Sequence, residues 1–162
     1  ARKIFCQTSF HESIIGRNLN LSNLESVGGN LWSEPTLDML EDFSSRDKKP
    51  KCSILNSPIP HKNTREAIGY CDIKKIEYDL CASSDYKSFL EQLSKNDTLV
   101  FFPQTPETLS RIVVESRMMG MKVITNRLVG ATQESWFKLK GSPLIDLMRQ
   151  KRIDIPNMVL GC

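Results

Sequence analysis

Short apolar runs alternate with longer segments of helical periodicity along most of this chain, and this alternation constrains the fold more than any other feature. Residues 52–55 and 98–102 are short and mostly apolar, as expected of buried strands. Phe89, Leu90 and Leu93 recur at the spacing of one helix face. Strands that alternate with helices in this way form a parallel sheet covered by helices. We therefore predict an α/β fold with a sheet of about four to six parallel strands.

Capping and turn residues indicate where several of these elements begin and end. Asp85 is a helix N-cap residue, and Asn63 or Thr64 caps the helix before it. Gly120 stands where a left-handed residue ends a helix. The predicted strands are 3–7, 25–27, 52–55, 75–78, 98–102 and 123–125, and the better-defined helices are 63–71, 85–93, 108–119 and 143–152.

One polar segment divides the chain. Residues 42–51 are rich in charged and small side chains, and we interpret them as a linker. Residues 1–41 then form a leading strand-and-helix segment, and residues 52–162 form the regular domain. Because the chain does not begin with Met, we expect it to be a piece of a longer protein.

Composition argues against several classes of protein. A net charge of +3, spread evenly over 162 residues, does not favour nucleic-acid binding. No apolar run approaches the ~20 residues of a transmembrane helix, and no signal peptide is recognisable. The five cysteines lack C-x-x-C spacing, so we expect thiols in a reducing cytoplasm. The two histidines and scattered cysteines do not fit a zinc site, and neither a phosphate-binding P-loop nor a nucleophile-elbow motif occurs.

The most informative feature is a pair of glutamates, Glu107 and Glu115, with seven residues between them. Glu107 follows a predicted buried strand, and a helix is predicted to begin directly after it. The free N–H groups of Thr108, Leu109 and Ser110 would then form an anion site suited to a diphosphate. Eight residues of helix rise about 12 Å, so the two carboxylates could bind hydroxyls at opposite ends of such a ligand.

The surrounding pattern resembles the E-x7-E signature of retaining GT-B glycosyltransferases, typified by glycosyltransferase family 4. Pro103, Glu107, Glu115, Gly120 and the strand 123–125 all fall in register with that signature. The resemblance implies a Rossmann-like domain, the nucleotide-sugar (donor) binding half of a GT-B fold, over residues 52–162. Residues 1–41 would be the end of the acceptor-side domain.

A second segment, residues 55–63, is similar to the opening of the donor domain in the same family, where Lys62 would neutralise the diphosphate. Two features depart from the family. Ser57 stands where an arginine is usual, and residues 108–110 replace Gly-Phe-Gly. The match covers about residues 51–126 well and residues 1–35 loosely.

The resemblance implies a retaining, metal-independent transfer of a sugar from a nucleotide-diphosphate donor to a glycan, lipid or small-molecule acceptor. Glu107 would be the catalytic residue at the transferred sugar, and Glu115 would bind the ribose hydroxyls. Lys62 and the N–H groups of residues 108–110 would bind the rest of the donor, with no metal or other cofactor. Because most of an acceptor domain is absent, we expect donor binding with little or no turnover. The alternative is a non-catalytic Rossmann-like nucleotide-binding or protein-interaction module, which the replaced arginine and glycines favour.

Overall fold

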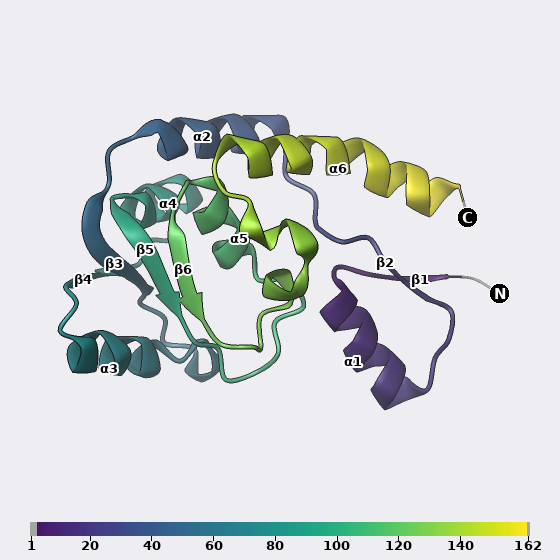
Figure 1. The fold of residues 1–162 in the computed structure, drawn as a ribbon, viewed down its shortest axis with the longest axis horizontal. Helices are drawn as coiled ribbons and strands as arrows, with labels where there is room; N and C mark the ends of the chain where they lie inside the picture. The colour runs from purple at the N-terminus through teal and green to yellow at the C-terminus, as the bar shows by residue number, and fades with distance from the viewer. Residues whose placement is uncertain (1–2, 162) are drawn as a thin grey trace.

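The computed structural model describes residues 3–161 and has an α/β fold built on a four-stranded parallel sheet (Figure 1). Strand β5 lies inside the sheet and runs parallel to both of its neighbours. The predicted fold class is therefore confirmed, with a Rossmann-like parallel sheet flanked by helices. In spatial order the strands are β4 (Tyr78–Cys81), β3 (Lys49–Leu55), β5 (Asn96–Phe101) and β6 (Lys122–Thr125).

Helices cover both faces of this sheet. One face carries the larger hydrophobic core, to which four helices contribute, and the other face carries α3 (Figure 1). The helices of the larger core are α2 (Glu34–Ser45), α4 (Tyr86–Ser94), α5 (Arg111–Met118) and α6 (Ser142–Leu160); α3 spans Thr64–Lys74.

The apolar run in β5 serves both faces. Leu99 and Phe101 pack into the larger core, whereas Val100, between them, packs with Ala67 and Cys71 of α3. All three β5 residues are at most 1% exposed. Successive side chains of a strand point to opposite faces, so a strand covered on both sides needs a continuous apolar run.

The amino-terminal segment forms a small unit of its own beside the carboxyl ends of the larger sheet. It contains β1 (Ile4–Cys6), α1 (Ser9–Leu19) and β2 (Leu24–Ser26), and the two strands pair in parallel. The indole N–H of Trp136 donates to the carbonyl of Gly28 at 2.8 Å, which ties this segment to the loop region after β6.

The predicted linker over residues 42–51 is mostly regular structure. Helix α2 runs to Ser45 and β3 begins at Lys49, so only residues 46–48 are irregular. The polar composition misled the prediction because the exposed end of α2, a short connection and the exposed start of β3 follow one another here, while Phe43 is fully buried in the core. A domain division at this point remains a prediction.

The boundary of one further element shifted. The predicted strand 75–78 lies at 78–81 because α3 continues to Lys74 and Lys75 ends it with a left-handed φ of 55°. Gly120 has the predicted left-handed conformation, with φ of 80°. None of the helices within residues 3–161 is long and apolar enough to cross a membrane.

Candidate functional site

Two loops meet at the point where the strand order reverses. From β3 the chain crosses to β4 on one side and later to β5 on the other side. The loops that leave the carboxyl ends of β3 and β5 therefore diverge, and in open α/β sheets ligands bind in the crevice at such a switch point. The loop after β3 contains the short 3-10 helix η1 (Pro60–Lys62), and the loop after β5 contains Glu107.

An ion pair joins these two loops. The Nζ atom of Lys62 lies 2.6 Å from Oε1 of Glu107, and the two side chains are 25% and 16% exposed. Lys62 Nζ also lies 5.8 Å from the centre of the Phe101 ring, where a cation is attracted to the aromatic face. The structure thus brings together the predicted phosphate-binding cation and the predicted catalytic carboxylate.

Backbone contacts hold the two loops in this arrangement. The N–H of Gln104 donates to the carbonyl of His61 at 2.9 Å, and the side-chain amide of Asn63 donates to the carbonyl of Phe102 at 3.0 Å. Asn63 takes a left-handed conformation with φ of 58°, which Asn tolerates better than most residues. The position of Lys62 is therefore fixed from both sides by the loop after β5.

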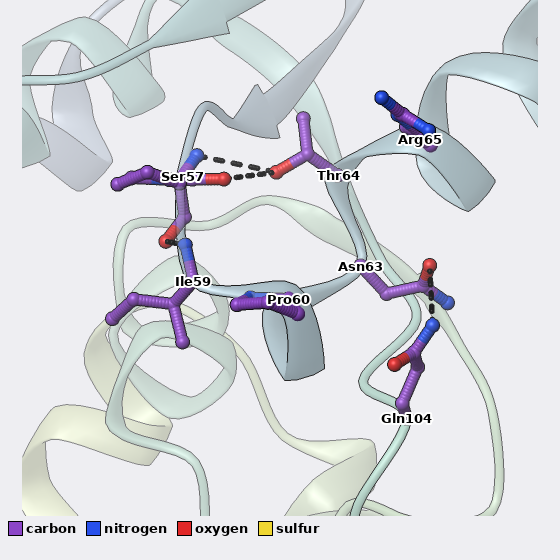
Figure 2. A pocket seen from close by; sticks show the side chains of 8 residues that line it. Ser57, Ile59, Pro60, Asn63, Thr64, Arg65 and Gln104 are labelled. Carbon is purple, nitrogen blue, oxygen red and sulfur yellow. Dashed lines mark hydrogen bonds between the residues drawn. The ribbon is translucent and has the colours of Figure 1, made fainter.

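A cavity of about 480 Å³ lies between the loop after β3, the start of α3 and Gln104 of the loop after β5 (Figure 2). Hydrogen bonds between Ser57 and Thr64, and between Gln104 and Asn63, shape its wall. Arg65, at the start of α3, is the one charged residue among its described lining residues. Lys62 and Glu107 are not part of that lining, which consists of Ser57, Pro58, Ile59, Pro60, Asn63, Thr64, Arg65 and Gln104.

The segment directly after Glu107 is bent and irregular rather than helical. Glu107 forms a parallel bridge with Val129, in which its N–H donates to Leu128 and its carbonyl accepts from Gly130. The side chain of Leu109 is buried in the core at 1% exposure, so only its backbone could meet a ligand.

Thr108 connects this segment to the amino-terminal unit. Its hydroxyl donates to the side-chain oxygen of Gln7, and its carbonyl accepts from the hydroxyl of Thr8. Gln7 and Thr8 directly follow β1, so the amino-terminal segment helps to position the loop that carries Glu107.

The prediction that a helix begins at Thr108 is wrong, because α5 begins at Arg111. Ser110 interrupts the backbone with φ of 71° and ψ of 92°, outside the helical region. The unpaired N–H groups at the start of this helix are therefore those of the turn that begins at Arg111, and not those of Thr108 and Leu109. Ser110 is 6% exposed, and its hydroxyl is enclosed without a hydrogen-bond partner among the described residues. A donor-binding role for residues 108–110 stays a prediction.

Glu115 lies apart from the ion pair, enclosed by three donors. Its Oε1 accepts from the indole N–H of Trp32 at 2.9 Å, from the Tyr86 hydroxyl at 2.7 Å and from Nε of Arg111 at 3.1 Å. The residue is 3% exposed. Burial raises the pKa of the Glu115 carboxyl, and the hydrogen bonds from Trp32 and Tyr86 and the charge of Arg111 oppose that rise.

Sequence reasoning missed these three partners. Arg111 stands four residues before Glu115, and this helical spacing could have revealed it. Trp32 is 83 residues away along the chain, and no sequence signal indicates the contact. Within residues 3–161, no group of three or more His, Cys, Asp or Glu side chains is arranged to hold a metal ion.

Comparisons of this chain with protein-family models, curated proteins and solved structures gave no match.

Proposed function

We propose that this chain binds a nucleotide-diphosphate sugar and forms the donor-binding half of a retaining glycosyltransferase of the GT-B type. The observation that carries the proposal is the contact of Lys62 with Glu107, from the two loops that diverge at the switch point of the sheet. A cation for phosphate and a carboxylate for sugar hydroxyls then stand side by side in the crevice where α/β sheets bind ligands.

On binding, Lys62 and Glu107 would give up their mutual ion pair and contact the ligand instead. The donor's diphosphate would pair with Lys62, and a hydroxyl of its sugar would donate to Glu107. During transfer, the bond between the sugar's anomeric carbon and the phosphate oxygen would break, a bond to the acceptor oxygen would form, and the proton of the acceptor hydroxyl would pass to the departing diphosphate. Negative charge grows on the departing diphosphate, where a fixed cation stabilises the transition state.

The start of α5 supports the same assignment. The first turn of this helix offers N–H groups, and the enclosed hydroxyl of Ser110 stands at its N-cap position. Helix N-termini attract anions through these groups and through the helix dipole. The phosphate groups of the donor are the part of the ligand that this feature suits.

A second candidate is a nucleotide-binding module that does not catalyse transfer. The enclosure of Glu115 at 3% exposure favours it, because a buried carboxylate with three donors also has a structural use. Ser57 favours it as well, since a hydroxyl replaces the second cation that the resemblance implies.

Calorimetric titration would separate the two candidates. The probes are the four common ribonucleoside diphosphates and their hexose conjugates, each with and without EDTA. Lys62→Met should weaken both kinds of ligand, and Glu107→Gln should weaken only the sugar conjugate. A hydrogen bond to a charged group contributes about 1.5–3 kcal/mol, so losses of roughly 10- to 150-fold are expected.

Lys51→Met is the matched control. Lys51 forms an ion pair of 2.9 Å with Glu77, but it lies near the amino end of β3, away from the two loops. Its replacement should leave all affinities unchanged. Equal losses for Glu107→Gln with nucleotide and conjugate would remove the assigned role of Glu107. If nucleoside diphosphates bind and no conjugate binds more tightly, the non-catalytic module is the better description.

A further inference from the structure

The cavity of about 480 Å³ between the loop after β3 and the start of α3 has the volume of a small-molecule site. Such sites measure about 300–1,000 Å³. Neither Lys62 nor Glu107 is among its described lining residues. The proposed donor site therefore leaves this cavity without an assigned ligand.

One wall of the cavity is apolar and rigid. It consists of Pro58, Ile59 and Pro60, and Ile59 is 46% exposed. Proline has a fixed φ and no N–H group, and the N–H of Ile59 donates to Oγ of Ser57 at 3.2 Å. This wall thus offers apolar surface and no free N–H, and an apolar group that covered it would order little of the chain.

Another wall of the cavity is polar (Figure 2). The side-chain amide of Gln104 donates to the side-chain oxygen of Asn63 at 3.3 Å. Within the described residues, the side-chain oxygen of Gln104 has no hydrogen-bond partner. Arg65 is exposed and forms no ion pair with any residue from 3 to 161. An acceptor and an unpaired cation are therefore both available to a ligand.

These features select an anion that also has an apolar part. Arg65 is the one charge on the described lining, so a cationic ligand would be repelled. The planar guanidinium group matches the geometry of carboxylate and phosphate, and hydrogen bonds to an ionised partner are the stronger kind. An inorganic anion would leave the apolar wall uncovered.

We propose that this cavity is a second ligand site, separate from the ion pair of Lys62 with Glu107, for a small organic anion with an apolar body. The carboxylate or phosphate of the ligand pairs with Arg65, and its apolar part covers Ile59 and the two prolines. A donor group on the ligand bonds to the side-chain oxygen of Gln104. This site is independent of the proposed donor function.

The cavity and Lys62 share structural elements. Pro60 lines the cavity and belongs to η1 together with Lys62. Asn63 and Gln104 also line the cavity, and they make the two hydrogen bonds that join the loops after β3 and β5. A ligand at either place would disturb the same loop. Locating the ligand therefore requires variants and competition as well as spectral changes.

The first test is an NMR titration of the isotopically labelled chain with naphthoate and naphthyl phosphate. Both should shift the backbone amide signals of Ile59, Asn63 and Gln104, with Kd values of about 1 mM or below. Neutral naphthamide lacks the anion, and inorganic phosphate lacks the apolar body. Each should bind about 10-fold more weakly. If neither organic anion shifts these signals at about 10 mM, the cavity is not a ligand site.

Variants then assign the anion contact. Arg65→Met should weaken both organic anions about 10-fold or more, and because Arg65 is exposed, the variant should fold with an unchanged melting temperature. Lys62→Met and Arg127→Met should change these affinities by less than about 3-fold. Arg127 is the matched control, since it is exposed in the loop after β6 and does not line the cavity. Equal losses in all three variants would show general attraction to a basic surface and overturn the site.

Competition with ADP, GDP, UDP and CDP separates this site from the proposed donor site. A nucleoside diphosphate that binds without displacing naphthoate would support two sites. One that displaces naphthoate competitively would place the cavity within the donor site and overturn the second site, while supporting nucleotide binding. If no nucleoside diphosphate binds and the naphthyl ligands still depend on Arg65, the proposed function fails and the second site stands.

Discussion

Replacing Gly130 with alanine should disrupt the loop that carries Glu107. A Cβ atom at Gly130 would lie 2.1 Å from the carbonyl oxygen of Thr108 and 2.7 Å from the hydroxyl oxygen of Thr8. Real Cβ atoms essentially never come within 3.0 Å of such neighbours, so the backbone at Thr108 must move by roughly 1 Å. A flexible side chain could turn aside, but a backbone carbonyl in a bridged segment cannot.

The magnitude follows from what that movement breaks. Overpacking a closely packed site costs about 1–3 kcal/mol. The movement would also break two hydrogen bonds, one from the Gly130 N–H to the Glu107 carbonyl and one from the Thr8 hydroxyl to the Thr108 carbonyl. Each contributes about 0.5–1.5 kcal/mol. The free energy of unfolding should therefore fall by about 2–6 kcal/mol in Gly130→Ala.

Urea unfolding followed by circular dichroism measures this loss, and Gly69→Ala is its control. Gly69 lies inside α3, and an added Cβ there would meet nothing within 4 Å. Alanine at an open helical position should raise the free energy of unfolding by about 0.5–1 kcal/mol. If Gly130→Ala unfolds within 0.5 kcal/mol of the parent chain, a threshold of about RT, the tight packing of this loop is not as the structure describes.

Three further predictions concern ionisation and surface charge. Burial raises the pKa of Glu115 above its unfolded value, so the parent's free energy of unfolding should fall as pH rises through the folded-state pKa. When urea unfolding is measured from about pH 4.5 to 7, the free energy of unfolding of Glu115→Gln should rise relative to that of the parent as pH rises. A difference that stays constant with pH would contradict this. In a Cys162→Ser variant, the four remaining cysteines should react with a thiol reagent only as the chain unfolds. Each of them is at most 2% exposed, and burial raises the pKa of Cys52 to about 12. Rapid labelling of the native chain at neutral pH would refute this prediction. Arg149 bridges α6 to three acidic residues of α2. Because these partners are largely exposed, Arg149→Met should destabilise the chain by less than about 1 kcal/mol, and the loss should shrink in 1 M salt; a larger, salt-insensitive loss in melting experiments would argue against this.

The parallel α/β architecture could be predicted because it depends on local periodicity. The apolar run in β5 and the helical spacing of Leu90 and Leu93 in α4 express burial directly in the sequence. The segment 42–51 could not be predicted in the same way. Its polar composition is shared by linkers and by the exposed face of a helix, and only the packing of Phe43 against the core distinguishes them.

The candidate site also has features that the sequence predicted and features that it did not. The resemblance assigned Lys62, Glu107, Glu115 and residues 108–110 to one donor site, and of these the structure joins Lys62 and Glu107 in an ion pair of 2.6 Å, whereas Glu115 has other partners. The start of α5 was predicted three residues too early, because the bridge between Glu107 and Val129 and the left-handed φ of Ser110 keep residues 107–110 out of the helix. Neither feature has a signature in the local sequence.

The sequence by itself determined the alternation of strands and helices that defines the parallel α/β fold. This alternation follows from side-chain periodicity. Only the tertiary structure decided that Glu115 is enclosed rather than open, and that Trp32 from the amino-terminal segment is its buried partner. A hydrogen bond between residues 83 positions apart depends on how the whole chain packs, and no short stretch of sequence encodes that packing.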